Sequence, residues 1–453
     1  MEAELASGRH SQTGFRTGPI IEAVDNQPWS GEANVHVSIA NWVETQDAAL
    51  LPKTRKLWFK VEPAAARKLR KRGTGPASKE YELDFRECDQ INSALSDMRD
   101  VSAAAILRAN QGYSYTGQYP RHEGFMLDEA EAREILRRDP KNAEVVLPFL
   151  VGSEFLTGGG PERWVIDFQT RGIFDAKNYQ LPFAHLQRKT LPYITAKAEN
   201  EQRKTGKYTG QDQNWLKTWW LHFRARPELI GKVSKLKRFI VCSRVTKRPV
   251  FVFVSPLIRP GDALSCFALE DDYSFGILQS SAHWLWFITK CSKFKSDFRY
   301  TPESVFDTFP WPQFEAGSSR REEAKASPAT VAKTTAVATA AREVRRVRAQ
   351  TLPKLKGGLR ALYRTLEPPG ANPLKDAHAA LDAAVLAAYG FSAKKDLLAQ
   401  LLELNLSVAQ RLENAEPVTP PGIPSTFPNP ETLISDDCIR PPALSGSPTC
   451  AQQ

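Results

Sequence analysis

The feature that most constrains the fold is a series of short apolar segments between residues 236 and 314, separated by turn-forming residues. Segments of four or five apolar residues bounded by turns are typical of buried strands. One segment is longer and rich in aromatic residues, which predicts a short helix at 282–291. We expect strands at 239–243, 250–254, 265–268 and 275–278. The predicted fold class is α+β with a mixed, mostly antiparallel sheet.

The remaining elements follow from the spacing of apolar residues along the rest of the chain. Asp128 is expected to open a helix that Asp139-Pro140 closes, and Gly390 is expected to end another. In chain order we expect strands at 19–24 and 35–39, helices at 88–110 and 128–138, two apolar runs within 145–168, and helices at 214–230, 374–389 and 394–413, with 329–350 either helix or linker.

Length and composition exclude several classes of protein. The 453 residues suffice for two to four domains of roughly 100–200 residues each. Apolar residues make up 42% and charged residues 25%, which excludes a wholly disordered or collagen-like chain. No apolar stretch approaches the roughly 20 residues of a membrane span, and the N-terminal sequence has no signal peptide. The six cysteines form no CxxC pair, which suits a reducing cytoplasm and argues against a zinc site.

The net charge of +10 is concentrated in three basic stretches. Residues 53–80 carry a net +8, residues 187–248 a net +12 and residues 318–360 a net +8. A single basic stretch is usually a solvated face or a linker. Three such stretches in one chain favour a polyanion as partner, and the sequence therefore predicts nucleic-acid binding.

The sequence contains few of the motifs that mark a catalytic site. The sequence has no GxGxxG after a strand, no GxxxxGK[ST], no HExxH and no GxSxG. A weak nuclease-like pattern places Asp167 eight residues before Asp175-Ala176-Lys177, and two carboxylates with a lysine can hold a magnesium ion and a water. The alternative is that Asp167 ends a buried strand and Asp175 caps a turn or helix. We favour this alternative because such loose matches mostly arise by chance.

Basic and aromatic residues are interleaved in the second basic stretch. Basic side chains neutralise phosphates, and aromatic rings can stack on bases. Trp219 and Trp220 can equally be core residues at helical spacing. Arg244, Lys247 and Arg248 lie at a strand–turn–strand junction, where they either contact phosphate or form a solvated hairpin tip.

Three motifs follow one another in order: FGILQSSAHWLW at 275–286, KFKSDFRY at 293–300 and VFDTFPWP at 305–312. This ordered set closely resembles the target-recognition domain of type IIG (type IIL) fused restriction–modification enzymes and related adenine-specific DNA methyltransferases. Flanking motifs extend the resemblance over about residues 18–415. QPWSGEA at 27–33 resembles the end of a methyltransferase domain, and LDAAV at 381–385 resembles the helical C-terminal domain of these enzymes.

The resemblance implies an order of domains. Residues 1–52 would be the last strands of a Rossmann-like methyltransferase sheet, 53–87 a basic linker, 88–315 the DNA target-recognition domain, 316–416 an α-helical C-terminal domain and 417–453 a disordered tail. The disorder of the tail is expected from its richness in Pro, Ser and Thr.

The resemblance also implies which residues contact DNA. Lys295 and Asp297 match the positions at which the family contacts a base pair. Their chemistry suits a G·C pair, since lysine donates to guanine and aspartate accepts from cytosine N4. In an extended segment, side chains two residues apart lie on one face. The alternative is that both are solvated charges that contact no base. Residues expected to contact the DNA backbone or to support its loops are Arg299, Ser280, Ser281, His283, Arg244, Lys247 and Arg248, with His283 more a structural residue than a base reader.

Two motifs of the family are missing. No Gly-rich loop for S-adenosylmethionine follows a strand, and no Asn/Asp-Pro-Pro-aromatic motif for the target adenine is present. We therefore expect the specificity half of a split or truncated enzyme, which binds double-stranded DNA in a sequence-specific way. It would methylate adenine N6 only when a catalytic subunit encoded nearby supplies S-adenosylmethionine and the catalytic motif. The alternatives are a degenerate gene product with weak, non-specific DNA binding and a metal-dependent nuclease built on Asp167, Asp175 and Lys177.

Overall fold

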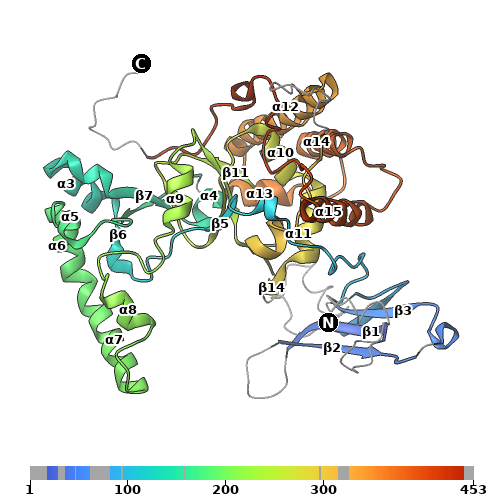
Figure 1. Ribbon diagram of the computed structural model, residues 1–453, viewed down its shortest axis with the longest axis horizontal. Helices are drawn as coiled ribbons and strands as arrows, with labels where there is room; N and C mark the ends of the chain where they lie inside the picture. Colours follow the sequence, from blue (N-terminus) through green and yellow to red (C-terminus); the bar gives the residue numbers. More distant parts are fainter. Residues whose placement is uncertain are drawn as a thin grey trace, which may run out of the picture.

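The computed structural model has the mixed α+β architecture that the sequence predicts (Figure 1). It describes residues 18–28, 36–45, 47–61, 82–92, 95–157, 159–294, 297–314 and 326–442. Three four-stranded sheets and one three-stranded sheet form the framework, and the helices gather around two of them. None of the described helices is both long and apolar enough to cross a membrane. The five cysteines in the described part of the chain are all free.

The N-terminal sheet has the strand order β2-β1-β3-β4. Its strands are β1 (Ile20–Pro28), β2 (His36–Trp42), β3 (Arg55–Val61) and β4 (Glu82–Cys88). β1 pairs with β2 antiparallel and with β3 parallel, and β3 pairs with β4 antiparallel. The prediction of a basic linker at 53–87 is therefore wrong for residues 55–61 and 82–87, which form strands, while 62–81 lie outside the described residues. Leu57 packs in the sheet's small core beside Ala23.

The predicted helix at 88–110 is also wrong, since the described residues there form bends and turns before a short 3-10 helix, η2 (Arg108–Asn110). The Asn92 side chain accepts a hydrogen bond from the Ser96 amide at 3.0 Å and donates one to the Ser96 hydroxyl at 2.9 Å. Leu95 has a left-handed backbone with φ +54°. Polar side chains that bond the nearby backbone compete with helix formation, which explains the irregular chain here.

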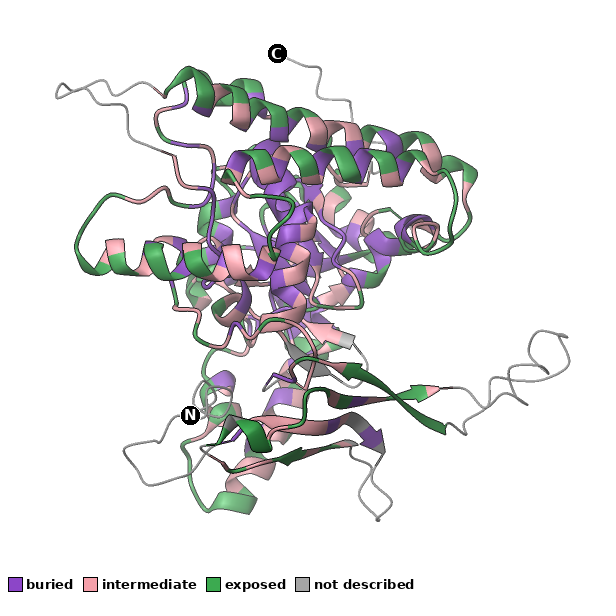
Figure 2. Cartoon of the chain, turned by 90° about the vertical axis from the view of Figure 1, so that its right-hand side faces the viewer, coloured by how far each residue is buried: buried purple, intermediate pink, exposed green. Residues whose placement is uncertain are grey.

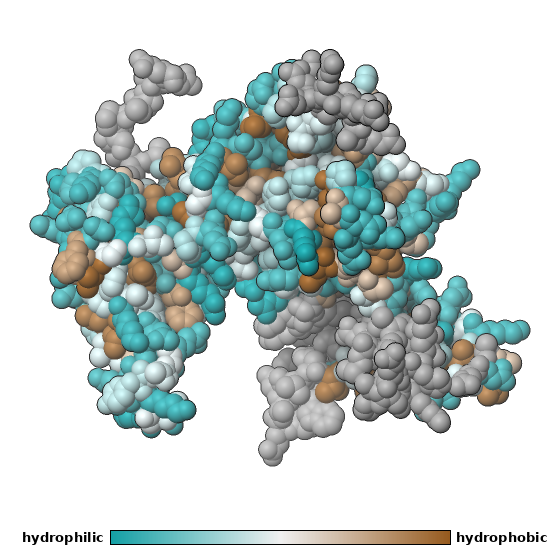
Figure 3. Space-filling view, viewed as in Figure 1, coloured by the Kyte–Doolittle hydropathy of each residue, from teal (hydrophilic) through white to brown (hydrophobic). Residues whose placement is uncertain are grey.

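A second sheet, β12-β7-β8-β6, forms the base of a lobe with its own apolar core. Its strands are β6 (Met126–Leu127), β7 (Val146–Leu150), β8 (Arg163–Ile166) and β12 (Arg259–Pro260). Its helices are α3 (Glu129–Arg138), α5 (Ile173–Lys177), α6 (Gln180–Lys189), α7 (Leu191–Thr205) and α8 (Gln211–Leu216). Asp128 caps α3 with a capping box, as predicted. α7 and α8 project as an arm, and Figure 3 shows a hollow between this lobe and the rest of the molecule.

The central sheet, β11-β9-β13-β5, is antiparallel throughout. Its strands are β5 (Ser114–Thr116), β9 (Phe239–Ser243), β11 (Val252–Val254) and β13 (Leu264–Phe267). Around it lie α4 (Gly152–Thr157), α9 (Pro227–Val233), α10 (Asp272–Gln279) and α11 (Ser281–Lys290). The strand expected at 275–278 is wrong, because these residues belong to α10. Every residue of α10 is buried, so no periodicity distinguishes this helix from a buried strand.

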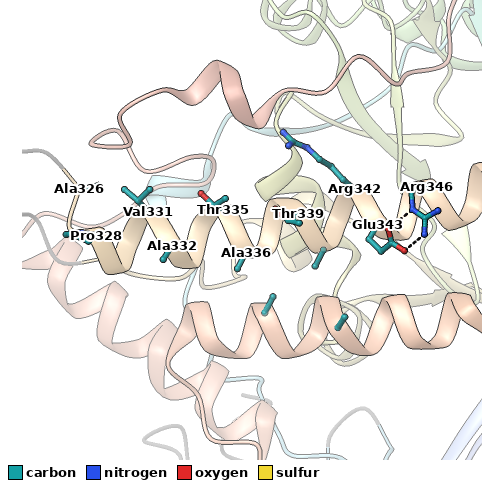
Figure 4. Close-up of a pocket in the computed structure, with 13 residues that line it drawn as sticks. Ala326, Pro328, Val331, Ala332, Thr335, Ala336, Thr339, Arg342, Glu343 and Arg346 are labelled. Carbon is teal, nitrogen blue, oxygen red and sulfur yellow. Dashed lines mark hydrogen bonds and ion pairs between the residues drawn. The ribbon is translucent and has the colours of Figure 1, made fainter.

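The C-terminal helices α12 (Pro328–Thr351), α13 (Gly358–Arg364), α14 (Pro373–Tyr389) and α15 (Leu397–Glu413) complete the main core. α12 packs along both α10 and α14. Gly276 allows the close approach of α10, since a Cβ there would lie 2.7 Å from a Val337 methyl. Small side chains of α12 and α14, among them Ala336 and Ala380, line a shallow apolar groove beside the helix pair (Figure 4). Gly390 ends α14 at φ +72°, as predicted.

Burial is uneven across the molecule. Figure 2 shows the buried residues gathered in the central and helical part, whereas the N-terminal sheet carries mostly exposed and half-buried side chains. Ile39 is 55% exposed and Trp42 is 58% exposed. A sheet with so little core of its own is not expected to fold alone.

The prediction of a disordered tail from 417 onward is wrong for residues 417–442, while 443–453 lie outside the described residues. Phe427 and Leu433 are buried in the main core. Ile439 lies beside β11, where its amide donates to the Phe253 carbonyl at 2.8 Å and its carbonyl accepts from the Ser255 amide at 2.9 Å. The segment is rich in proline, but it buries enough apolar surface and makes enough backbone hydrogen bonds to be held in place.

A buried carboxylate fixes this segment to the core. Asp272 accepts hydrogen bonds from Arg238 at 2.7 Å and Arg342 at 2.6 Å, and it also pairs with Arg345. Asp437 of the C-terminal segment pairs with Arg238 at 2.9 Å and with Arg345 at 2.7 Å. Burial alone would raise the pKa of Asp437, but the Arg345 hydrogen bond and charge outweigh it and lower that pKa.

Replacing Asp272 with asparagine should lower the free energy of unfolding by about 3–5 kcal/mol, because it removes the buried carboxylate that three arginines share and leaves Asp437 as the carboxylate that pairs with Arg238 and Arg345. Chemical denaturation of the full chain measures this change. Asp436→Asn is the matched control, since the Asp436 side chain is 99% exposed and, among the described residues, forms an ion pair with Arg440 alone. We expect no measurable change in the control. Equal unfolding free energies for the two variants would contradict a stabilising role of the buried carboxylate.

Candidate nucleic-acid interface

A three-stranded sheet, β10-β15-β14, carries Asp297 and Arg299, and Arg244, Lys247 and Arg248 flank its strand β10. Its strands are β10 (Val245–Thr246), β14 (Ser292–Phe294) and β15 (Asp297–Arg299). β15 lies between β10 and β14 and pairs antiparallel with both, so that Arg299 is opposite Val245 on one side and Ser292 on the other. This sheet follows α11 directly and continues from the end of β9.

The proposed base-reading pair lies where β14 gives way to β15. Asp297 begins β15, which runs antiparallel to β14, and pairs with Phe294. The expectation of an extended segment over 295–297 stays a prediction, because this stretch includes Lys295 and Ser296. Lys295 lies outside the described residues, and base reading by Lys295 and Asp297 stays a prediction.

His283 is a structural residue, as expected. It is buried, with Nδ1 2.9 Å from the Leu278 carbonyl and Nε2 3.0 Å from the Tyr300 hydroxyl. Burial lowers the pKa of His283 to about 3. The ring is therefore neutral; Nδ1–H donates to the carbonyl and Nε2 accepts from Tyr300. Because Tyr300 directly follows β15, this pair fixes the end of the strand that carries Arg299.

Ser280 and Ser281 anchor the start of α11. The Ser280 hydroxyl accepts a hydrogen bond from the His283 amide at 3.4 Å, which makes Ser280 the N-cap. The Ser281 amide donates to a carboxylate oxygen of Asp382 on α14 at 2.7 Å. Ser280 is buried, so the structure gives it a supporting role and not a phosphate contact.

Lys247 and Arg248 lie in the turn after β10, but their environments differ. Lys247 is exposed. The Arg248 guanidinium lies 4.7 Å from the ring centre of Trp284 and 5.5 Å from that of Tyr363. Stacking on two aromatic rings holds this charge at a fixed place while its hydrogen-bonding edge stays available.

Two adjoining cavities connect this turn with the C-terminal helices. One, of about 490 Å³, is lined by Lys247, Arg248, Arg360 and Arg364 among others. The other, of about 460 Å³, is lined by Arg244, Arg299 and Arg360 among others. Arg360 and Arg364 were missed in the sequence. They lie four residues apart on α13 and so share one face, a spacing that could have identified them once the helix was known.

The arm carries a second basic patch at its tip, formed by exposed Arg203, Lys204 and Lys207. Tyr208 beside them is 71% exposed. The tryptophans of the same stretch are different. Trp215 and Trp220 are buried in the lobe core, and Trp219 packs against it. For the tryptophans, the core interpretation is the correct one.

The nuclease-like pattern does not form a metal site. Asp167 is buried and accepts hydrogen bonds from Arg259 at 2.9 Å and Gln118 at 3.1 Å. Asp175 and Lys177 are exposed on α5. The Asp167 carboxylate is thus committed to protein donors. Within the described residues no group of three or more His, Cys, Asp or Glu side chains could hold a metal ion.

Comparison with known proteins agrees with this geometry. Residues 233–313 match the family model described as MmeI, target recognition domain. This segment is similar to the MmeI target recognition domain. The fold is also similar to the solved structure of the type IIL restriction–modification enzyme MmeI in complex with DNA, with a TM-score of 0.61 and 18% sequence identity over 86% of this chain. The resemblance inferred from the ordered motifs is confirmed.

The similarity covers only part of the MmeI chain. The chain covers 46% of the MmeI chain, so it spans about half the length of that enzyme. Among curated proteins the comparison finds no match. Arg244, Lys247, Arg248 and Arg299 lie inside the segment matched to the MmeI domain, whereas Arg360 lies outside it. The cavities therefore join the matched segment to a C-terminal helix that the family model does not include.

Replacing His283 with glutamine should alter how stability depends on pH. Folded His283 stays neutral down to about pH 3, whereas in the unfolded chain it takes up a proton below about pH 6.5. The wild type therefore loses stability from this group as the pH falls, and the variant does not. The difference in unfolding free energy between them should narrow by about 1.4 kcal/mol per pH unit below pH 6.5. A difference that stays constant from pH 7 to pH 4.5 would contradict a neutral, buried His283.

Proposed function

We propose that this chain binds double-stranded DNA and recognises its sequence, as the target-recognition part of a restriction–modification system. The observation that carries the proposal is the match of residues 233–313 to the MmeI target recognition domain. That match covers the four basic residues that the structure gathers around β10 and β15. The MmeI structure with the similar fold was solved in complex with DNA, which supports the same class of ligand here.

The charge arrangement supports binding to a DNA backbone. Six cationic side chains line the two cavities, and Asp262 and Glu367 are the carboxylates that line them. Each phosphate that such a surface neutralises releases a bound counterion, so affinity should fall steeply with salt. Backbone contacts set the register of the protein on the duplex, and base contacts set the sequence. The connection between β14 and β15 that contains Lys295 is the proposed site of base contacts.

The proposed reaction of the whole system is methyl transfer to adenine N6, with S-adenosylmethionine bound by a partner chain. The described residues between 18 and 100 lack the strand–helix unit that would hold that cofactor. Between residues 18 and 100 they form strands, turns and one 3-10 helix but no α-helix, so no helix N-terminus meets a strand end there. No methyl-transfer step is therefore assigned to these residues. S-adenosylmethionine would supply the methyl group on the catalytic subunit.

The N-terminal sheet supports the existence of such a partner. Strand register places Ile39, Val24, Trp58 and Phe85 in one row across all four strands. Ile39 and Phe85 in this row are exposed, at 55% and 39%. The parallel pairing of β1 and β3 is typical of sheets that are covered on both faces. A catalytic subunit encoded nearby is the partner we propose for this face.

Selection of bound sequences from a randomised duplex pool, at two salt concentrations, tests the proposal. The wild type should enrich one motif, and Lys295→Glu combined with Asp297→Arg should change that motif at one base pair, because the donor and acceptor positions are exchanged. Each mismatched pair typically costs about 1–3 kcal/mol, which is enough to shift the enriched base.

The matched control is Glu343→Arg combined with Arg346→Glu, which exchanges an exposed ion pair on α12 and keeps the net charge. The control should enrich the wild-type motif. Salt-dependent binding of the wild type with no enriched motif would contradict sequence recognition by this chain alone. It would favour the non-specific binding expected of a degenerate product.

A further inference from the structure

Four arginines, Arg224, Arg226, Arg244 and Arg299, lie close to one another near the loop that carries Asp262. Arg244 directly follows β9, and its amide donates to the Ala263 carbonyl at 2.8 Å. Arg244 and Arg299 line the same cavity of about 460 Å³. Arg226 precedes α9, and its charge and that of Arg299 both act on Arg244. Arg224 acts in the same way on Arg226. The cluster thus joins residues from three separate parts of the chain.

A close backbone approach holds the cluster together. Tyr119 and Arg224 exchange two backbone hydrogen bonds of 3.0 Å. Gly117 lies against Gly261, where an added Cβ would be 2.1 Å from the Gly261 carbonyl oxygen. Only glycine permits this contact, which brings the segment of Arg224 beside the loop of Asp262.

The cluster has too little negative charge around it. Among the described residues, none of the four guanidinium groups forms an ion pair within 4.0 Å, and Asp262 and Glu303 act on Arg226 and Arg244 only at longer range. The Nε atoms of Arg226 and Arg244 are buried and have no hydrogen-bond partner. Burial, followed by the charge of the neighbouring arginines, lowers the pKa of both side chains. Unpaired buried donors and like charges together cost stability.

The backbone at Arg226 adds a second, independent sign of a binding site. Arg226 has φ +52° and ψ +53°, a left-handed conformation that is uncommon for a residue with a side chain, and Pro227 follows it. Such strained positions persist where the surrounding structure holds them, and they are concentrated at ligand sites. The fold therefore keeps this guanidinium in place against both strain and repulsion.

We propose that Arg226 and Arg244, together with Arg299, form a binding site for one phosphate group of the bound DNA backbone, called the seat below. A phosphodiester carries the missing negative charge, and its oxygens can accept hydrogen bonds from two guanidinium groups at once. The identity of the ligand as DNA rests on the proposed function, whereas the seat for a phosphate-like anion rests on the arginine cluster. A phosphate contact contributes affinity for every sequence and positions the protein without reading a base.

The first experiment measures binding of the full chain to a 20-base-pair duplex over a range of salt concentrations. Arg226→Gln should weaken binding about ten-fold, which corresponds to one charge-assisted hydrogen-bonded contact. The slope of log affinity against log salt should fall in magnitude by about 0.9, the value for one phosphate. The enriched motif should stay the same. Arg346→Gln, which removes the same charge from an exposed site on α12, should leave binding nearly unchanged.

The second experiment compares the thermal unfolding midpoint in sodium phosphate and in sodium chloride of equal ionic strength. Phosphate should raise the midpoint of the wild type but not that of Arg226→Gln or Arg244→Gln. Without phosphate, both variants should be at least as stable as the wild type, because each removes a repulsive charge. A lower midpoint in both variants, with the duplex affinity and salt slope unchanged, would overturn the proposal and make the cluster structural.

These outcomes are separate from those that test sequence recognition. In one outcome the wild type enriches no motif, while Arg226→Gln shows no phosphate-induced rise of the unfolding midpoint and a salt slope smaller in magnitude by about 0.9. The phosphate site is then supported and the proposed sequence recognition fails. In another outcome the wild type enriches a motif, and Arg226→Gln binds the duplex with the same affinity and the same salt slope as the wild type. The proposed phosphate site is then contradicted and the proposed function is supported.

Discussion

The buried carboxylate of Asp272 is the interaction on which the rest of the structure depends. It lies at the start of α10 and pairs with Arg238, which directly precedes β9, and with two arginines of α12, so one charge joins the central sheet to the helical part. The same arginines hold Asp437, which places the C-terminal segment beside β11. Loss of one carboxylate from a buried ion network is strongly destabilising, because the arginine charges that remain in the core are then incompletely compensated.

The frame built around Asp272 positions the candidate interface through short links. α10 ends at Gln279, and Ser280 then caps α11, whose first amide is held by Asp382 on α14. His283 on α11 in turn accepts the Tyr300 hydrogen bond and so fixes the end of β15. The basic residues beside β10 and on β15 and α13 therefore lie on rigid supports, which is the condition for reading a DNA duplex in one register.

The sequence predicts those elements whose local pattern agrees with their environment. The strand at 239–243 is confirmed because it is a short, uniformly apolar segment between turns, and the helix at 374–389 is confirmed to within one residue because Gly390 ends it. α10 could not be recognised, since a helix buried on every side has no periodicity. The strands within 53–87 were hidden by their charge, because only Leu57 of β3 is buried.

The ordered motifs lie in the segment that matches the MmeI target recognition domain, but they do not include every basic residue of the candidate interface. Arg244, Lys247 and Arg248 flank β10, and Arg299 lies on the neighbouring strand β15, so the pairing of these two strands brings the four residues together. Arg226 and Arg360 join them only through tertiary packing, which no local pattern records. Ser280 and His283 carry the family motif and yet are buried, so their sequence pattern reflects support of the strand and not contact with DNA.

Hydrogen exchange of the full chain, with and without a saturating duplex, tests the central claim most directly. DNA binding should slow the hydrogen exchange of backbone amides in three places: residues 244–248, residues 298–300 and α13. Protection confined to the α12–α14 groove or to the C-terminal segment, with these three regions unchanged, would contradict the assignment of this basic surface as the DNA interface.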